Sequence, residues 1–125
     1  MRNFFLFLLP AVTLFADQVV LSNGDTISGK VVKKDGATLT VHSEFLGDVT
    51  MPWTAVKSLR SDEDLTVVLP GGESVKGKVS TSGASFEVAG ASGTTTTPLA
   101  EVSAVRNAAE QHAWERLQRP HIFDL

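Results

Sequence analysis

The sequence predicts an all-β protein made of two similar small barrels in tandem, followed by a C-terminal α-helix. Three observations lead to this prediction. The first is an internal repeat, because Val19–Val32 aligns without a gap with Val67–Ser80. The second is an alternation of apolar and polar residues within each copy, which is the period of half-buried strands. The third is a change to strong helix formers after Arg106.

The repeat continues beyond this first segment. GATLTV at 36–41 matches GASFEV at 83–88, and PWTAVKSLR at 52–60 matches PLAEVSAVR at 98–106. Glycines, prolines and apolar positions agree along most of each copy. The chain therefore contains two copies of one structural unit.

Each unit contains short strands joined by tight turns. In the first unit, Val19 and Leu21 alternate with polar residues, as do Leu39 and Val41. Glycine is favoured in such turns because it accepts positive backbone φ angles. The predicted turn glycines are Gly24, Gly36 and Gly47 in the first unit and Gly72, Gly83 and Gly93 in the second.

A glycine also falls inside the second strand of each unit, at Gly29 and Gly77. Glycine weakens a strand unless it permits a sharp bend or a close backbone approach, and a bent second strand closes a small barrel. Pro52 and Pro98 each precede the last strand of a unit. Because proline fits the first turn of a helix, we expect one 3₁₀ turn after each. SH3-like and Sm-like barrels have the same order of elements, namely a strand, a bent strand, two further strands, a helical turn and a last strand. The alternative is one continuous antiparallel sheet or sandwich made from both repeats.

The apolar positions of the two units predict the core. A unit of this length without a disulfide or a metal is near the lower limit for independent folding, so we expect the two units to pack on each other. The predicted core residues are Leu21, Ile27, Val31, Leu39, Val41, Trp53 and Val56 in the first unit and Leu69, Val79, Phe86, Val88 and Val102 in the second.

The N-terminal segment has the features of a secretory signal peptide. Arg2 precedes an apolar stretch from Phe4 to Phe15, and the small residue Ala16 precedes the polar Asp17. The stretch is shorter than the roughly 20 residues that a membrane-spanning helix needs. We expect cleavage of this segment and export across a bacterial inner membrane into the periplasm, with no transmembrane segment left after cleavage.

Two further segments lie outside the repeats. Asp62–Asp64 is expected to be a solvated acidic linker rather than a Ca²⁺ site, because neighbouring residues of an extended chain point in opposite directions. Asn107 can cap a helix that Pro120 stops, and this helix is expected either to cover an open barrel end or to lead away from it. The predicted organisation is a signal peptide at 1–16, small barrels at 17–61 and 66–106, an acidic linker at 62–65, a helix at 107–119 and a tail at 120–125.

Composition speaks against several classes of function. The chain has no cysteine, which rules out disulfides, thiolate metal sites and cysteine nucleophiles. Its formal net charge is −3 and it has no Lys/Arg block, whereas nucleic-acid binding depends on neutralising phosphates. The three histidines lack metal-ligand spacing, and no recognised hydrolase or phosphate-loop motif occurs. We expect no catalytic residue, no metal site and no cofactor.

A few polar and aromatic residues have alternative interpretations. His42 is expected to be a plain surface histidine, and the carboxylates of Asp25 and Asp48 are expected to bond nearby backbone N–H groups in turns. Trp53 either belongs to the core or lines a peptide-binding groove, as aromatic residues do in SH3 domains. Its counterpart in the repeat is Leu99, and an apolar residue in both copies favours the core.

An export signal, two units of the type VVLSNGDTISGKVV and a final VRNAAEQHAWERLQRP together resemble the N-terminal region of bacterial proteins in the salt-induced outer-membrane protein family, or domain of unknown function 481. The resemblance covers residues 17–125 and rests on structural motifs. In the longer relatives a membrane β-barrel follows this region, whereas this sequence stops at Leu125. The resemblance implies an envelope protein and supplies no catalytic residues.

The sequence thus favours a non-catalytic periplasmic binding or assembly module, possible partners being an envelope protein or a cell-wall component. It would be equivalent to the soluble N-terminal part of an outer-membrane β-barrel protein. The alternative is a bacterial SH3-type module that binds peptidoglycan or peptides. An enzyme would need a cleft with convergent ionisable groups between the units.

Overall fold

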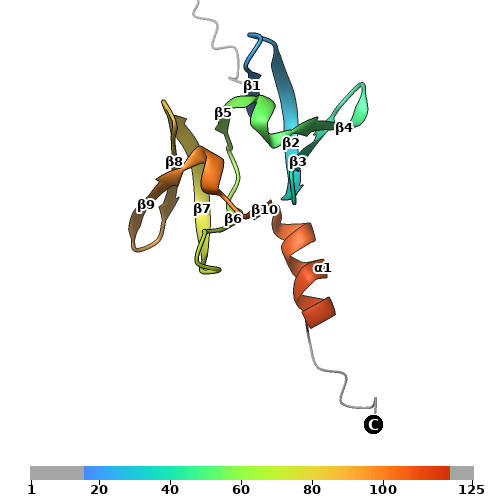
Figure 1. Ribbon diagram of the computed structural model, residues 1–125. Helices are drawn as coiled ribbons and strands as arrows, with labels where there is room; N and C mark the ends of the chain where they lie inside the picture. Colours follow the sequence, from blue (N-terminus) through green and yellow to red (C-terminus); the bar gives the residue numbers. More distant parts are fainter. Residues whose placement is uncertain (1–15, 119–125) are drawn as a thin grey trace, which may run out of the picture.

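Residues 16–118 are described by the computed structural model, and they form ten strands, two 3₁₀ turns and one α-helix (Figure 1). Almost all of the expected signal peptide and the expected tail lie outside these residues. The first half contains β1 (Asp17–Leu21), β2 (Thr26–Asp35), β3 (Thr38–Ser43), β4 (Gly47–Pro52), η1 (Trp53–Ala55) and β5 (Val56–Arg60). The second half contains β6 (Leu65–Val68), β7 (Ser74–Ser82), β8 (Ser85–Gly90), β9 (Gly93–Pro98), η2 (Leu99–Glu101) and β10 (Ala104–Arg106), and α1 (Ala108–Gln118) follows.

The same order of elements therefore occurs twice, and so does the pairing of the strands. In the first half β1 pairs with β2 and β5, β2 with β3, and β3 with β4, all antiparallel. In the second half β6 pairs with β7 and β10, β7 with β8, and β8 with β9. The predictions of an all-β fold, a C-terminal helix and a 3₁₀ turn after each proline are confirmed.

The two halves share one sheet. β10 pairs with β2 as well as with β6, so that Val105 lies opposite Lys34 and Arg106 opposite Lys33. The resulting strand order is β4-β3-β2-β10-β6-β7-β8-β9, and β1 pairs with β2 and β5 with β1 outside this order. β4 and β9 stand at the two ends of this order, so the sheet is open. Two separately closed barrels are not confirmed, because β10 joins the halves instead of closing only its own.

A corresponding contact joins β5 to β7. The N–H of Ser61, just after β5, donates to the carbonyl oxygen of Val79 at 2.9 Å, and the N–H of Leu59 donates to Thr81 Oγ1 at 3.3 Å. Likewise the N–H of Asn107, just after β10, donates to the carbonyl oxygen of Val32 at 2.9 Å. Each half therefore places the end of its last strand against the bent strand of the other half.

The glycines lie where the turns and bends occur. All six predicted turn glycines have positive φ, from 60° to 130°. At Gly29 and Gly77 the reason for glycine is different, because a Cβ atom would collide with the backbone carbonyl oxygen of His42 and of Ala89, respectively. These two residues mark the point where β2 and β7 change partners along their length: β2 pairs with β1 up to Gly29 and with β3 from Lys30 onward.

One apolar core contains residues from both halves, so the two units pack on each other. Three of the predicted core residues, Leu21, Ile27 and Leu69, are half-buried against this core. Leu65, Val67 and Val105 lie fully buried near the junction of the halves. The other predicted core residues are all buried, namely Val31, Leu39, Val41, Trp53, Val56, Val79, Phe86, Val88 and Val102.

The helix α1 leads away from the strands and buries none of its residues (Figure 1). Asn107 caps it as expected, because its Oδ1 accepts the N–H of Glu110 at 2.8 Å. The Arg106 guanidinium lies 4.4 Å from the ring centroid of Trp114. No helix within residues 16–118 is both long enough and apolar enough to span a membrane.

Candidate functional site

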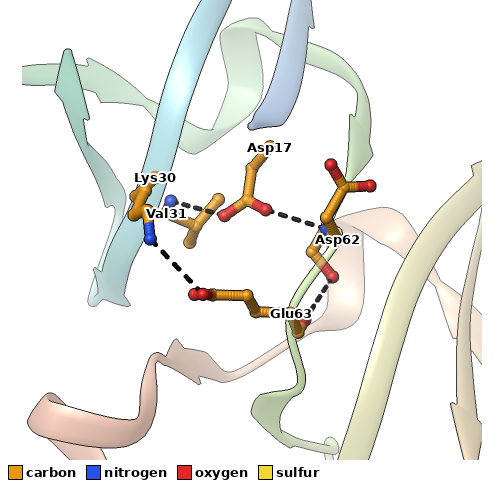
Figure 2. A network of polar contacts seen from close by, with 6 residues as sticks. Asp17, Lys30, Val31, Asp62 and Glu63 are labelled. Atoms are coloured by element: carbon orange, nitrogen blue, oxygen red, sulfur yellow. Dashed lines mark hydrogen bonds and ion pairs between the residues drawn. The ribbon is translucent and has the colours of Figure 1, made fainter. Parts of the chain in front are cut away.

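Asp17 is the most deeply buried acidic residue within residues 16–118, with only 3% of its surface exposed. Figure 2 shows its carboxylate between β2 and the segment after β5. Oδ2 accepts the backbone N–H of Val31 at 2.7 Å, and Oδ1 accepts the backbone N–H of Asp62 at 2.9 Å. Both carboxylate oxygens are therefore used to hold backbone groups, which is a structural role.

The surroundings of Asp17 act on its ionisation in two directions. Burial raises the pKa of its carboxyl group above the ordinary value, and the nearby negative charges of Glu63 and Asp62 raise it further. The two backbone hydrogen bonds oppose this by lowering the pKa. Lys30 Nζ lies 3.3 Å from Glu63 Oε2, and this ion pair is more than half exposed on both sides. It therefore contributes little to stability.

The acidic segment after β5 is more than the solvated linker that the sequence suggested. Ser61 is 5% exposed, and its Oγ accepts the N–H of Val79 at 2.8 Å while donating to the carbonyl oxygen of Glu63 at 2.9 Å. The linker is also shorter than expected, because Leu65 already belongs to β6 and is buried. The side chains of Glu63 and Asp64 are exposed. The segment thus ties the end of the first half to the bend of β7.

Trp53 connects the two 3₁₀ turns. Its Nε1 donates to the carbonyl oxygen of Leu99 at 2.8 Å, and Leu99 is its own counterpart in the repeat. The indole is 6% exposed and meets the Phe86 ring edge to face, with 6.1 Å between the centroids. A buried indole with its N–H bonded is a core residue. Trp53 therefore has the core role, and it also lines the groove described below, as the second interpretation expected of it.

A buried lysine completes this junction. Lys34 Nζ donates to the carbonyl oxygens of Gly36 at 2.8 Å and Ser103 at 3.1 Å, and it lies 5.2 Å from the Trp53 ring centroid. Burial lowers the pKa of this ammonium group, and the nearby Asp35 carboxylate partly offsets the effect. Lys34 therefore links β2 to the segment before β10 through contacts that satisfy its charge.

An apolar groove of about 340 Å³ lies between η1 and η2. None of its lining residues carries a charge, and the buried Trp53 is one of them. Thr54 and Ala100 are exposed at equivalent positions of the two turns. Other lining residues are Val56, Ala84, Pro98 and Leu99. Such a lining suits an apolar or extended peptide segment more than a charged ligand.

Two large apolar side chains are exposed side by side in the turn between β3 and β4. Phe45 is 90% exposed and Leu46 is 76% exposed, and we call them the apolar turn pair. The equivalent turn between β8 and β9 contains Ala91 and Ser92. The fold therefore forms this turn without large apolar residues. The repeat alignment contained this signal, but sequence reasoning did not single it out.

The polar residues named from the sequence do not come together. His42 Nδ1 lies 2.8 Å from Asp48 Oδ1 across the β3–β4 pair, and both side chains are exposed. The expectation that the Asp48 carboxylate bonds a nearby backbone N–H is wrong, because the carboxylate pairs with this imidazole. The expectation is wrong for Asp25 as well, because its carboxylate accepts from the side-chain amide Nδ2 of Asn23 at 3.0 Å. Within residues 16–118, no group of three or more His, Asp or Glu residues is arranged to hold a metal ion.

The fold thus defines an open, twice-repeated antiparallel sheet with a C-terminal helix. Comparisons with known proteins find no matching family model, no matching curated protein and no matching solved structure.

Proposed function

We propose that this chain is a non-catalytic binding or assembly module of the bacterial cell envelope. It would be equivalent to the soluble N-terminal part of an outer-membrane β-barrel protein, with each half being an SH3-like or Sm-like unit whose last strand also contacts the other half. The export pattern of residues 1–16 and the resemblance to salt-induced outer-membrane proteins support the compartment. The repeated order of strands and 3₁₀ turn supports the relation to small barrels.

The apolar turn pair is the observation that carries the binding role. Large apolar side chains exposed together mark contact sites more often than chance, and the other half shows that the turn does not need them. Their neighbours Glu44 and Asp48 are acidic and exposed. A partner with an apolar pocket surrounded by basic residues would therefore complement this turn.

Site-specific photo-crosslinking in the living bacterium tests this proposal. A photoreactive residue at Phe45 is expected to form a defined crosslink to one envelope component, whereas the same residue at Ala91 in the equivalent turn is not. Equal crosslinking from both positions, or none from Phe45, contradicts the role of the apolar turn pair. Export is checked separately by fusing the C-terminus to a reporter enzyme that folds only outside the cytoplasm.

The groove between η1 and η2 supports a second candidate function, which is binding of peptidoglycan or peptides in the manner of bacterial SH3 modules. Its uncharged lining is the observation that favours this candidate. Sedimentation with purified peptidoglycan tests it. Saturable retention that is lost in Thr54→Arg and in Ala100→Arg supports it, because both residues are exposed and an arginine there fills the groove without touching the core. Absence of retention contradicts it.

A further inference from the structure

The free edge of β9 differs from the edges that most folded proteins expose. β9 stands at one end of the strand order and pairs with β8 along its whole length without a register shift. Figure 1 shows it at the outer rim of the second half, away from α1. Along an edge strand, alternate residues direct their backbone N–H and C=O groups outward, where they are free to pair with another strand.

The composition of β9 leaves this edge unprotected. Thr94–Thr97 is four threonines in succession, and the strand contains no charged residue and no bulge, with its one proline at its end. Proteins usually block such edges with lysine, other charges, proline or a bulge. The equivalent edge strand β4 carries the charged Asp48. The third strand with a single partner, β5, carries Lys57 and Arg60, so only β9 among these three strands lacks a charged residue.

We propose that β9 is a self-association edge, at which a second copy of this chain pairs antiparallel with the first around a two-fold axis. The threonine run is self-complementary, because threonine faces threonine in several antiparallel registers and such cross-strand pairs are favourable. It also offers no charge or large side chain with which to select a foreign strand. A symmetric pair closes on itself and leaves β4 free at both outer ends.

The overall negative charge does not prevent this contact. The acidic residue on the neighbouring strand β8 is Glu87, and it lies opposite Thr96 of β9. In the paired sheet, the Glu87 residues of the two copies are three strand spacings apart, or about 14 Å. This exceeds the screening length of about 8 Å at physiological ionic strength. Their repulsion is therefore weak.

Equivalent positions on the two edge strands provide matched variants. Thr96 on β9 and Thr50 on β4 correspond in the repeat, and both are exposed. Thr96→Lys places one positive charge from each copy close to the two-fold axis, where like charges oppose pairing. Thr50→Lys makes the same chemical change on the edge that the proposal leaves free.

Sedimentation equilibrium over a range of concentrations tests the proposal on the full chain. The unmodified chain is expected to form dimers, Thr96→Lys to raise the dimer dissociation constant at least about tenfold, and Thr50→Lys to leave it unchanged. Thr94→Lys provides a second β9 variant, and circular dichroism shows whether each variant is folded. A chain that stays monomeric up to about 1 mM overturns the proposal. Loss of association in Thr50→Lys also overturns it, because that result shows that the β4 edge takes part in the association.

Discussion

The two halves of the molecule bend the same strand at the same place but stabilise the bend with different side chains. In β2 the bend at Gly29 is followed by Val31, whose N–H is bonded by the Asp17 carboxylate. In β7 the bend at Gly77 is followed by Val79, whose N–H is bonded by the Ser61 hydroxyl. Val31 and Val79 are equivalent in the repeat, so the same backbone donor needs an acceptor in both halves.

The two acceptors come from different places. Asp17 begins β1 of its own half, whereas Ser61 belongs to the first half and reaches into the second. The position equivalent to Asp17 is the buried Leu65, which has no acceptor to offer. The second half therefore depends on the first for this hydrogen bond. Both copies of the fold thus need an acceptor for the same backbone N–H, but the side chain that accepts it differs in chemistry and in its place along the chain.

Replacing the two bend glycines is expected to have the largest effect on the free energy of unfolding. Gly29→Ala and Gly77→Ala each place a Cβ against a backbone carbonyl that cannot move without breaking a strand pair. We expect each to lower the free energy of unfolding by about 3 kcal/mol or more. Gly77→Ala is expected to be the worse, because its Cβ would also lie 2.6 Å from the Ala89 carbonyl carbon, against 3.0 Å for the His42 carbonyl carbon at Gly29. Urea denaturation measures both.

Gly71→Ala is the control for these two substitutions. Nothing lies within 4 Å of the Cβ that it would add, and its φ is not in the positive range. Its unfolding free energy should change by less than about 1 kcal/mol. If Gly29→Ala and Gly77→Ala are as mild as this control, the close backbone approach is not what makes glycine necessary at the bends.

The next effect comes from removing the two acceptors. Ser61→Ala leaves the buried N–H of Val79 without an acceptor, which costs about 1–3 kcal/mol. Asp17→Ala should cost more, because it removes the acceptor for Asp62 as well as for Val31. Hydrogen exchange should show faster exchange of the Val79 amide in the first variant and of the Val31 amide in the second. The exposed Asp25→Ala serves as the control and should change stability by no more than about 0.5 kcal/mol.

The chemical difference between the acceptors predicts a difference in pH dependence. Because the folded state raises the pKa of Asp17 above 3.8, the protonated carboxyl is favoured by folding. The resulting stabilisation is present below pH 3.8 and is lost as the pH rises through the raised pKa. The free energy of unfolding of the unmodified chain should therefore rise relative to that of Asp17→Asn as the pH falls from 7 toward 3.8. The difference for Ser61→Ala should stay constant, because serine does not titrate there.

If the unfolding free energies of the unmodified chain and of Asp17→Asn change with pH in parallel, the predicted contribution of Asp17 is contradicted. The variant is chosen because asparagine keeps the shape of the side chain and one acceptor oxygen but cannot ionise. Chemical denaturation at several pH values measures all three chains under the same conditions.

Much of the fold followed from the sequence because its signals are local. The turn glycines, the proline before each 3₁₀ turn and the Asn107 cap act over a few residues, and each occurs where expected. Barrel closure did not follow, because whether β10 completes its own half or also joins β2 depends on contacts between residues distant in the chain. The burial of Asp17 and Lys34 was missed for the same reason, since polarity alone places such residues at the surface.

The candidate site was predictable only through the repeat. Phe45 and Leu46 align with Ala91 and Ser92, which indicates that the turn does not need large apolar residues to form. This alignment needs no structure. The structure adds that both large side chains are exposed. For the groove between η1 and η2, the sequence suggested only Trp53 as a lining residue, because the other wall comes from the second half.

The smallest expected effect concerns the apolar turn pair itself. Replacing Phe45 and Leu46 with Ala and Ser makes this turn equivalent to the β8–β9 turn, and the exposed side chains lose little burial by leaving. We expect the unfolding free energy to change by less than about 0.5 kcal/mol in thermal or urea denaturation. Binding to an envelope partner should nevertheless be lost. A large destabilisation would show that the pair supports the fold, and it would remove the reason to regard this turn as a contact site.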